Sequence, residues 1–318
     1  MVFNAKKSLC FVMCVLACVS AFAFSKLPDA VAEMKIGVLA GPSGIPASYL
    51  MENAGEAETF EVFAGANLLL PKLISGEIDI GFLPPNVAAK AYNANLGSVL
   101  LAAVSGNGMM SLVTKDKNVH SVKDWAGKKI SVAGQGATPD YMIRYLLAFY
   151  GVEAELDFSI PNAQIAPALI SGKIDYALVP EPFATVAETK DSSVIRAIDI
   201  QAAFAEASGS DGIFPMTVIA VNAHFAAKYP KAVKAFLEAY QKAAAWTVAN
   251  PSLAGELAEK HALGLPAAVS AAAIPHCAFT FKRAKDAKND VEKILKVFLD
   301  FAPASIGGKL PDDAFYFR

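Results

Sequence analysis

The chain has 318 residues, of which 54% are hydrophobic, and its formal net charge at pH 7 is −2. This length is sufficient for two domains that each have a core, and the near-neutral charge excludes binding to nucleic acid through a basic surface. Three of the four cysteines lie within the first 18 residues. Once that segment is removed only Cys277 remains, which excludes an intramolecular disulfide and a cysteine metal cluster.

The first segment of the chain is typical of an export signal. Lys6 and Lys7 precede an apolar run from Leu9 to Phe24, and Ala21-Phe22-Ala23 has the small-x-small form of a signal-peptidase site. The run is shorter than the ~20 residues of a membrane-spanning helix. We therefore interpret residues 1–23 as a signal peptide and expect a periplasmic or other extracytoplasmic location.

A second type of processing overlaps the first. Val15-Leu16-Ala17-Cys18 resembles a lipobox, which would place a lipid anchor on Cys18. A polar tether normally follows a lipidated cysteine, whereas residues 19–24 are mostly apolar, so we favour cleavage after Ala23.

The part of the chain after the signal alternates β-rich runs with helical patterns. In its first block, the predicted strands are 35–39, 58–62, 78–83 and 98–104, and the predicted helices are 46–53, 66–75 and 86–93. This alternation predicts βαβ units and a mostly parallel sheet that is buried on both faces.

The same pattern restarts in the middle of the chain. The predicted strands there are 129–133, 155–159, 174–179 and 194–198, and the predicted helices are 139–150, 164–171 and 182–189. Two further apolar runs, 111–113 and 218–221, are candidates for segments that cross between domains. After residue 221 we expect helices over 230–250, 251–261 and 286–301, with no strand among them.

An internal repeat supports two similar domains. The segment Leu73–Asp79 (LISGEID) reappears 96 residues later as Leu169–Asp175 (LISGKID), and a proline, Pro84 or Pro180, follows each copy. One interpretation is a common junction of helix, glycine and strand. We favour a second one, two α/β domains built on one plan: residues 34–112 with 222–318, and residues 113–221.

The loops after the strands are the places to look for a ligand, because parallel α/β sheets bind ligands beyond the carboxyl ends of their strands. After the first strand, Gly41, Ser43 and Gly44 offer backbone amides and a helix N-terminus that favours an anion. The alternative there is a plain turn with Ser43 as a helix cap.

The loop from Gly134 to Asp140 resembles a dinucleotide-binding fingerprint, but Pro139 stands where the last glycine belongs, which disfavours a nucleotide. Instead, Thr138 is predicted as a helix N-cap and Pro139 as the first helical residue. Free amides around Gly136, Ala137 and Thr138 would then point into a cleft and hold a carboxylate, sulfonate or phosphate.

A similar cap is predicted in the second half of the chain, with Glu181 as N-cap and Pro182 at the first helical position. Glu181 could instead bind a cationic or hydroxyl group. Phe82, Phe183 and Phe214 could form an aromatic wall or belong to the core. The complete set of candidate ligand contacts is Gly41, Ser43, Gly44, Phe82, Pro84, Asn86, Ser105, Asn107, Gly134, Gly136, Ala137, Thr138, Glu181, Phe183 and Phe214.

Signals for catalysis are weak. The four histidines have no metal-ligand spacing, and the chain contains no H-E-x-x-H, G-x-S-x-G or Walker sequence. His276-Cys277 suggests nucleophilic chemistry, but adjacent side chains usually point apart, and a structural pair is favoured. We expect no cofactor, no metal and no enzymatic activity.

Taken together, the export signal, the repeated LISGxID junction, Pro84-Pro85-Asn86, the Gly134–Asp140 loop and Pro180–Phe183 resemble bacterial substrate-binding proteins of ABC importers. The branch is the one similar to binders of nitrate, sulfonate, taurine and thiamine precursors. The resemblance extends over about residues 34–318, and residues 274–277 and 307–316 resemble an uncharacterised subgroup.

This resemblance implies the type II periplasmic-binding-protein fold, in which two crossover strands join two domains that close on a small ligand. It implies a monomer that docks on a membrane permease driven by a cytoplasmic ATPase. Arg144 and Arg196 are the only arginines of the middle block, so an oxyanion would depend on backbone amides. Aromatic or heterocyclic ligands therefore stay open.

Two alternative functions remain at this point. One is an enzyme on the same fold that acts on a pyrimidine or a related precursor, a class that works in the cytoplasm. The other is a ligand-sensing module that docks on a receptor.

Overall fold

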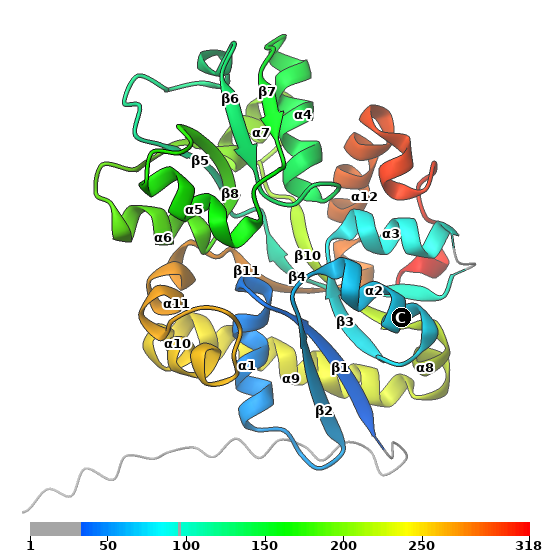
Figure 1. Cartoon of the computed structure of the whole chain (residues 1–318). Helices are drawn as coiled ribbons and strands as arrows, with labels where there is room; N and C mark the ends of the chain where they lie inside the picture. Colours follow the sequence, from blue (N-terminus) through cyan, green and yellow to red (C-terminus); the bar gives the residue numbers. More distant parts are fainter. Residues whose placement is uncertain (1–32, 95–96) are drawn as a thin grey trace, which may run out of the picture.

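The computed structural model describes residues 33–94 and 97–318 (Figure 1). The predicted signal peptide of residues 1–23, with Cys18 and the cleavage site, lies outside the described residues. Among the helices that are described, none combines the length and the hydropathy that a membrane crossing requires.

The first sheet has six strands in the order β11-β4-β10-β3-β1-β2. β1 pairs in parallel with β2 and β3, while β10 runs antiparallel between β3 and β4, and β11 is antiparallel to β4. The strands are β1 (Met34–Leu39), β2 (Glu58–Phe63), β3 (Ile80–Leu83), β4 (Val99–Asn107), β10 (Pro215–Asn222) and β11 (Phe279–Arg283).

Helices cover both faces of this sheet, which explains why its central strands are almost continuously apolar. One face packs on Phe236 and Tyr240 of the longest helix, and the other packs on Leu69, Leu73 and Val291. The helices are α1 (Ile45–Glu52), α2 (Ala66–Ser75), α3 (Pro85–Ala94), α8 (Ala223–Lys228), α9 (Pro230–Ala249), α10 (Pro251–Lys260), α11 (Ala267–Ala273) and α12 (Ala284–Phe301).

The second sheet has five strands in the order β7-β6-β8-β5-β9. Its strands are β5 (Met110–Thr114), β6 (Lys129–Val132), β7 (Glu155–Asp157), β8 (Tyr176–Pro180) and β9 (Ile195–Asp199). Its helices are α4 (Thr138–Tyr150), α5 (Asn162–Ile170), α6 (Phe183–Lys190) and α7 (Ile200–Ser208). In Figure 1 this green part lies above the first sheet, and α4 approaches α12.

The repeated segment marks equivalent places in the two sheets. Its copies end α2 and α5 and lead into β3 and β8, and Gly76 and Gly172 adopt left-handed conformations with φ of 80° and 73°. A left-handed residue ends a helix, and glycine adopts it at little cost. The strand orders correspond as well, because β2-β1-β3-β10-β4 of the first sheet matches β7-β6-β8-β5-β9 of the second.

The chain crosses between the sheets twice, from β4 to β5 and from α7 to β10. Each crossing delivers an antiparallel strand that lies between two others in the sheet that it enters, β5 between β8 and β9 and β10 between β3 and β4. The predicted two-sheet α/β fold with two crossovers is therefore confirmed. The domain boundaries at residues 112/113 and 221/222 stay a prediction. In the structure, the chain passes from the first sheet to the second at residues 108–109 and returns to the first within residues 209–214.

The expectation that no strand follows residue 221 is wrong, because β11 pairs with the edge of β4. Its sequence carries Lys282 and Arg283, and only Phe279, Lys282 and Arg283 have paired partners, with a register irregularity between them. A short, half-exposed edge strand has little hydrophobic alternation. The short helices α7, α8 and α11 were likewise not predicted.

Candidate functional site

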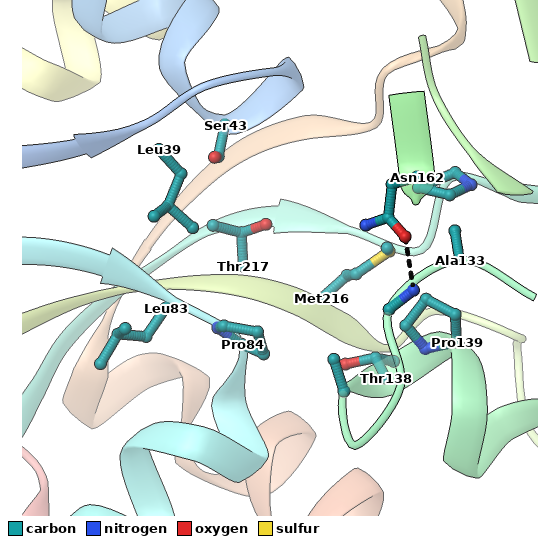
Figure 2. A pocket seen from close by; sticks show the side chains of 13 residues that line it. Leu39, Ser43, Leu83, Pro84, Ala133, Thr138, Pro139, Asn162, Met216 and Thr217 are labelled. Carbon is teal, nitrogen blue, oxygen red and sulfur yellow. Dashed lines mark hydrogen bonds between the residues drawn. The ribbon is translucent and has the colours of Figure 1, made fainter. Parts of the chain in front are cut away.

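A cavity of about 160 Å³ lies between the two sheets (Figure 2). It is bounded by the carboxyl ends of β1, β3, β6 and β8 and by the start of the antiparallel β10. This is the place where parallel α/β sheets bind ligands. The lining comprises Leu39, Ser43, Leu83, Pro84, Ala133, Gly134, Ala137, Thr138, Pro139, Asn162, Pro180, Met216 and Thr217.

The polar side chains of this lining are all neutral. They are Ser43, Thr138, Asn162 and Thr217, and none of the described lining residues carries a charge. Oδ1 of Asn162 accepts a hydrogen bond of 3.0 Å from the amide of Gly134, which leaves its NH₂ group for the cavity. The cavity therefore offers hydrogen-bonding groups within a mostly apolar wall.

Thr138 is the most informative of these side chains. It is only 1% exposed, and within the described part of the chain its Oγ1 has no hydrogen-bond partner. A buried hydroxyl without a partner costs about 1–3 kcal/mol. Because Thr138 lines the cavity, a ligand could supply the missing partner.

Thr138 is not the predicted N-cap. It is the first residue of α4, after Ala137 as N-cap, and its side chain makes no capping bond. The carboxylate of Asp140 serves the loop instead, since its Oδ2 accepts from the amide of Gly136 at 2.9 Å. A carboxylate in the first turn of a helix is favoured by the free amides and the dipole there.

The expectation of free amides around Gly136–Thr138 is wrong for two of the three groups. The amide of Gly136 donates to Asp140, and the amide of Ala137 donates to the carbonyl of Gly134 at 3.0 Å. Pro139, as the next residue, has no amide hydrogen. This loop is closed on itself rather than open toward the cavity.

A side chain of the first domain reaches this loop. Nδ2 of Asn86, in the first turn of α3, donates to the carbonyl oxygen of Gly136 at 3.1 Å. Asn86 is 1% exposed, and its Oδ1 has no partner among the described residues. This bond ties the two halves of the molecule together beside the cavity.

Glu181 lies outside the lining and is engaged by the protein itself. It is 1% exposed, forms an ion pair with Arg196, and accepts from the hydroxyl of Thr185 at 2.8 Å. The predicted cap is wrong by one residue, because α6 begins at Phe183 with Pro182 as N-cap. The backbone of Glu181 therefore stands one position further out, while its carboxylate reaches the amide of Thr185.

Both arginines of the middle block are paired. Nε of Arg144 lies 2.6 Å from Oδ1 of Asp140, and Nε of Arg196 lies 2.7 Å from Oε2 of Glu188. Each guanidinium is therefore directed at a carboxylate of its own domain rather than at the cavity.

The proposed aromatic wall does not line the cavity. Phe82 is buried in the first domain, with its ring 5.2 Å from that of Tyr240, and Phe214 packs 5.1 Å from Phe204. Phe183 packs against the core of the second domain.

Of the fifteen candidate contacts, the structure brings five to the cavity and leaves ten outside its lining. Those in the lining are Ser43, Pro84, Gly134, Ala137 and Thr138. Those outside it are Gly41, Gly44, Phe82, Asn86, Ser105, Asn107, Gly136, Glu181, Phe183 and Phe214.

Eight lining residues are absent from the candidate contacts, and three of them are the last residues of strands. Leu39, Leu83 and Pro180 end β1, β3 and β8, in or next to the segments in which the candidate contacts were predicted. Asn162 opens α5 after β7, and the same strand-end rule applied to that loop could have found it.

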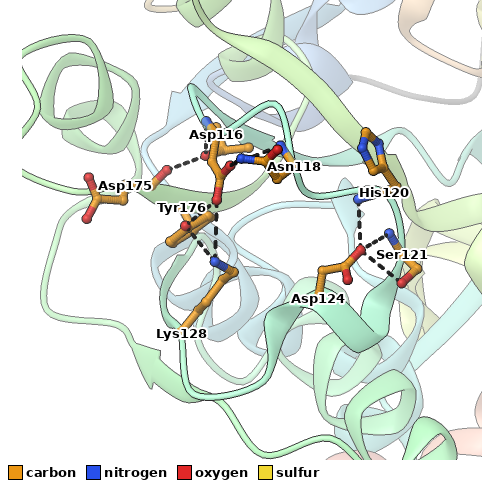
Figure 3. Close-up of polar contacts among 9 residues, drawn as sticks. Asp116, Asn118, His120, Ser121, Asp124, Lys128, Asp175 and Tyr176 are labelled. Atoms are coloured by element: carbon orange, nitrogen blue, oxygen red, sulfur yellow. Dashed lines mark hydrogen bonds and ion pairs between the residues drawn. The ribbon is translucent and has the colours of Figure 1, made fainter.

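A second group of polar contacts lies at the opposite end of the second sheet (Figure 3). The hydroxyl of Tyr176 donates to Asp116 at 2.8 Å, and Lys128 donates to Tyr176 at 2.7 Å. The amide of Asn118 and the Tyr176 hydroxyl lower the pKa of Asp116 to about 2. Because Lys128 and Tyr176 lie at the amino ends of β6 and β8, this cluster holds a loop and does not reach the cavity.

The dipeptide His276-Cys277 is split by the fold. His276 is exposed, whereas Cys277 is buried, and burial raises the pKa of its thiol, an effect that the Glu181 carboxylate increases. A thiol with a raised pKa is a poor nucleophile. Within the described residues, no group of three or more His, Cys, Asp or Glu side chains could hold a metal ion.

The sequence was compared with protein-family models and with curated proteins. The model of the NMT1-like family matches residues 29–262. No curated protein sequence gives a significant match.

Solved structures share the fold over most of the chain. An ABC transporter structure from Parabacteroides distasonis is 26% identical, with a TM-score of 0.76, and the match covers 90% of this chain and 98% of that one. The periplasmic aliphatic sulphonate binding protein SsuA from Escherichia coli is 18% identical over 90% and 92%, with a TM-score of 0.70. The periplasmic nitrate-binding protein NrtA from Synechocystis PCC 6803 is 18% identical over 75% and 69%, with a TM-score of 0.59. These likenesses confirm the periplasmic-binding-protein fold.

Proposed function

The chain belongs to the NMT1-like family, and from that premise we propose that it is the extracytoplasmic substrate-binding component of an ABC importer. The observation that carries this proposal is the cavity whose walls come from both sheets, with Leu39 and Leu83 on one side and Ala133 and Pro180 on the other. A ligand held there contacts both domains at once.

Domain closure is the step that couples capture to transport. A ligand that contacts both walls binds the closed form more tightly than the open form, and this difference in affinity shifts the population toward the closed form. The Asn86–Gly136 bond supports such a closed arrangement. A permease could then distinguish the loaded protein from the empty one by its shape.

The similar structures support the choice of partners. The names of two of them describe periplasmic binding of a sulphonate and of nitrate, and another is called an ABC transporter. On this basis the partners are a membrane permease with its ATPase, and the location is extracytoplasmic. Mass measurement of the mature protein distinguishes a lipid anchor at Cys18 from cleavage after Ala23.

The alternative of an enzyme finds less support. Cys277, the one nucleophile that the sequence suggested, is buried with a raised thiol pKa and lies outside the cavity lining. The neutral lining supports capture of a small molecule.

Native mass spectrometry of the protein purified from its own host tests this function. We expect one small molecule, released by denaturation, that raises the melting temperature when it is added back to the emptied protein. A ligand at 100 times its dissociation constant stabilises the folded state by about 2.7 kcal/mol, roughly 5 °C in Tm for a protein of this size.

A control replaces Thr138 with Trp to fill the cavity, and it should abolish both the co-purified molecule and the shift. The proposal fails if no small molecule is recovered and no host metabolite fraction changes the melting temperature.

A further inference from the structure

We propose that the cavity selects an uncharged ligand, and that Asp140 is the residue that excludes anions from it. This inference rests on the proposed function and names the class of ligand. It differs from what a likeness to sulphonate and nitrate binders suggests, because it follows from charges in this chain.

The N-terminus of α4, which would attract an anion, already holds the carboxylate of Asp140. Asp140 is the third residue of this 13-residue helix, and its side chain is 7% exposed. Its Oδ2 accepts from the amide of Gly136, and its Oδ1 lies 2.6 Å from Nε of Arg144. The first turn of the helix and Arg144 are thus both engaged by a protein carboxylate.

A second anion at this end of α4 would find its donors already engaged by the Asp140 carboxylate. Thr138 and Pro139, which line the cavity, immediately precede Asp140 in the same helical turn. Asp140 itself lies outside the lining and is paired with Arg144, so it acts by engaging the donors that an anion would need, the amide of Gly136 and the guanidinium. Burial of an unpaired charge is unfavourable in any case, and the described lining offers no cation to offset it.

The groups that face the cavity fit a neutral molecule. The hydroxyls of Ser43, Thr138 and Thr217 and the NH₂ group of Asn162 can each donate a hydrogen bond (Figure 2). The buried Thr138 hydroxyl lacks a partner in the described chain. The best match is a compact uncharged molecule with an apolar body and one or more acceptors, such as a carbonyl oxygen or a ring nitrogen.

The test measures anion binding to the wild-type protein and to the variants Asp140→Asn and Asp140→Ala. The probes are sodium nitrate and sodium methanesulfonate, titrated by calorimetry at constant ionic strength against sodium chloride. We expect no saturable binding to the wild type and saturable anion binding to both variants, at least about tenfold tighter than the weakest binding that the titration detects.

Arg144→Gln is the matched control. It removes the partner of Asp140 but leaves the carboxylate on the helix, so this variant should stay without saturable anion binding. Circular dichroism checks that each variant is folded, and Asp140→Asn, which preserves the acceptor for Gly136, keeps the test informative if Asp140→Ala does not fold.

Saturable binding of nitrate or methanesulfonate to the wild type, abolished by Thr138→Trp, would overturn the inference. So would the absence of any gain in the folded variants. These results are separate from the proposed function: recovery of an anionic ligand from the host would refute this inference while the binding function stands.

Discussion

At the scale of single residues, the site is defined by which polar groups the protein has left without partners. Thr138 and Asn86 each keep a buried oxygen without a hydrogen bond in the described chain, whereas Asp140 and Glu181 are fully engaged. In the sequence, the charged side chains of Asp140 and Glu181 stand out more than the hydroxyl of Thr138. The structure shows that an engaged carboxylate holds the loop, and that an unengaged hydroxyl is the better candidate for ligand contact.

Replacing Thr138 with Val should separate binding from stability. The empty protein should keep its free energy of unfolding within about 1 kcal/mol, because the lost hydroxyl has no partner to leave behind. Affinity for the host ligand, measured by calorimetry, should fall about tenfold.

Thr247→Val is the matched control for that change. Thr247 in α9 is also fully buried, its hydroxyl has no partner among the described residues, and it lies outside the cavity lining. This variant should leave the affinity unchanged. Equal loss of affinity in both variants would argue against a ligand contact at Thr138.

Replacing Glu181 with Gln should destabilise the fold by about 2 kcal/mol, measured by urea unfolding. The change leaves the half-buried Arg196 with Glu188 as its remaining acid, and removal of one partner of a buried pair is costly. Glu155→Gln, which breaks an exposed pair with Lys129, should cost about 0.5 kcal/mol or less. If the two variants lose the same stability, the buried pair has no special structural role.

At the scale of secondary structure elements, close packing between helix and sheet requires particular small residues. Gly37 lies in β1 beneath α2, and a Cβ at this position would be 2.2 Å from Cδ1 of Leu69. A Cβ added at Gly81 of the neighbouring β3 would be 3.1 Å from Cδ2 of the same leucine. The two glycines let the leucine of α2 settle directly on the sheet.

Replacing Gly37 with Ala should therefore force Leu69 or α2 to move. We expect a loss of about 1–3 kcal/mol in the free energy of unfolding, as for other overpacked cores, measured by urea denaturation. Gly55→Ala, which has open space around it, should change stability little. A double variant with Leu69→Val should regain part of the loss, and additive losses in the double variant would contradict this packing argument.

At the scale of the whole molecule, a hydrophobic cluster that includes residues of both sheets and a hydrogen bond beside the cavity connect the two halves. The Asn86–Gly136 bond lies beside the cavity, and the rings of Tyr141 in α4 and Phe298 in α12 lie 5.6 Å apart. Opening of the cavity must break the hydrogen bond from Asn86 to Gly136. The affinity for a ligand therefore includes the free energy of closure.

Replacing Asn86 with Ala should shift the empty protein toward open forms. Small-angle scattering should show a larger radius of gyration without ligand, and the affinity for the host ligand should fall, since less of the protein is closed. Asn93→Ala is the control, because Asn93 lies in the same helix but bonds to the carbonyl oxygen of Ile306 within the first domain. An unchanged radius of gyration in Asn86→Ala would show that this bond does not hold the halves together.

The sequence by itself determined the fold class, the two repeated βαβ units and most element positions. These features depend on local patterns: apolar strands, helical periodicity, and glycines such as Gly76 and Gly151 that end helices in left-handed conformations. The repeated LISGxID segment predicted that the two domains are similar, because each copy specifies the same turn from helix to strand.

Only the tertiary structure decided which groups are available at the site. The roles of Asp140, Glu181 and the arginines depend on partners that lie at other positions in the chain or in the same turn, and a pattern of residue types does not say which pairs form. Phe82 belongs to the core because it packs against Tyr240, far along the sequence, and Phe214 is buried against Phe204. Strand ends could be located from the sequence, but the charge and hydrogen bonding of the cavity emerge only when both sheets bring their side chains together.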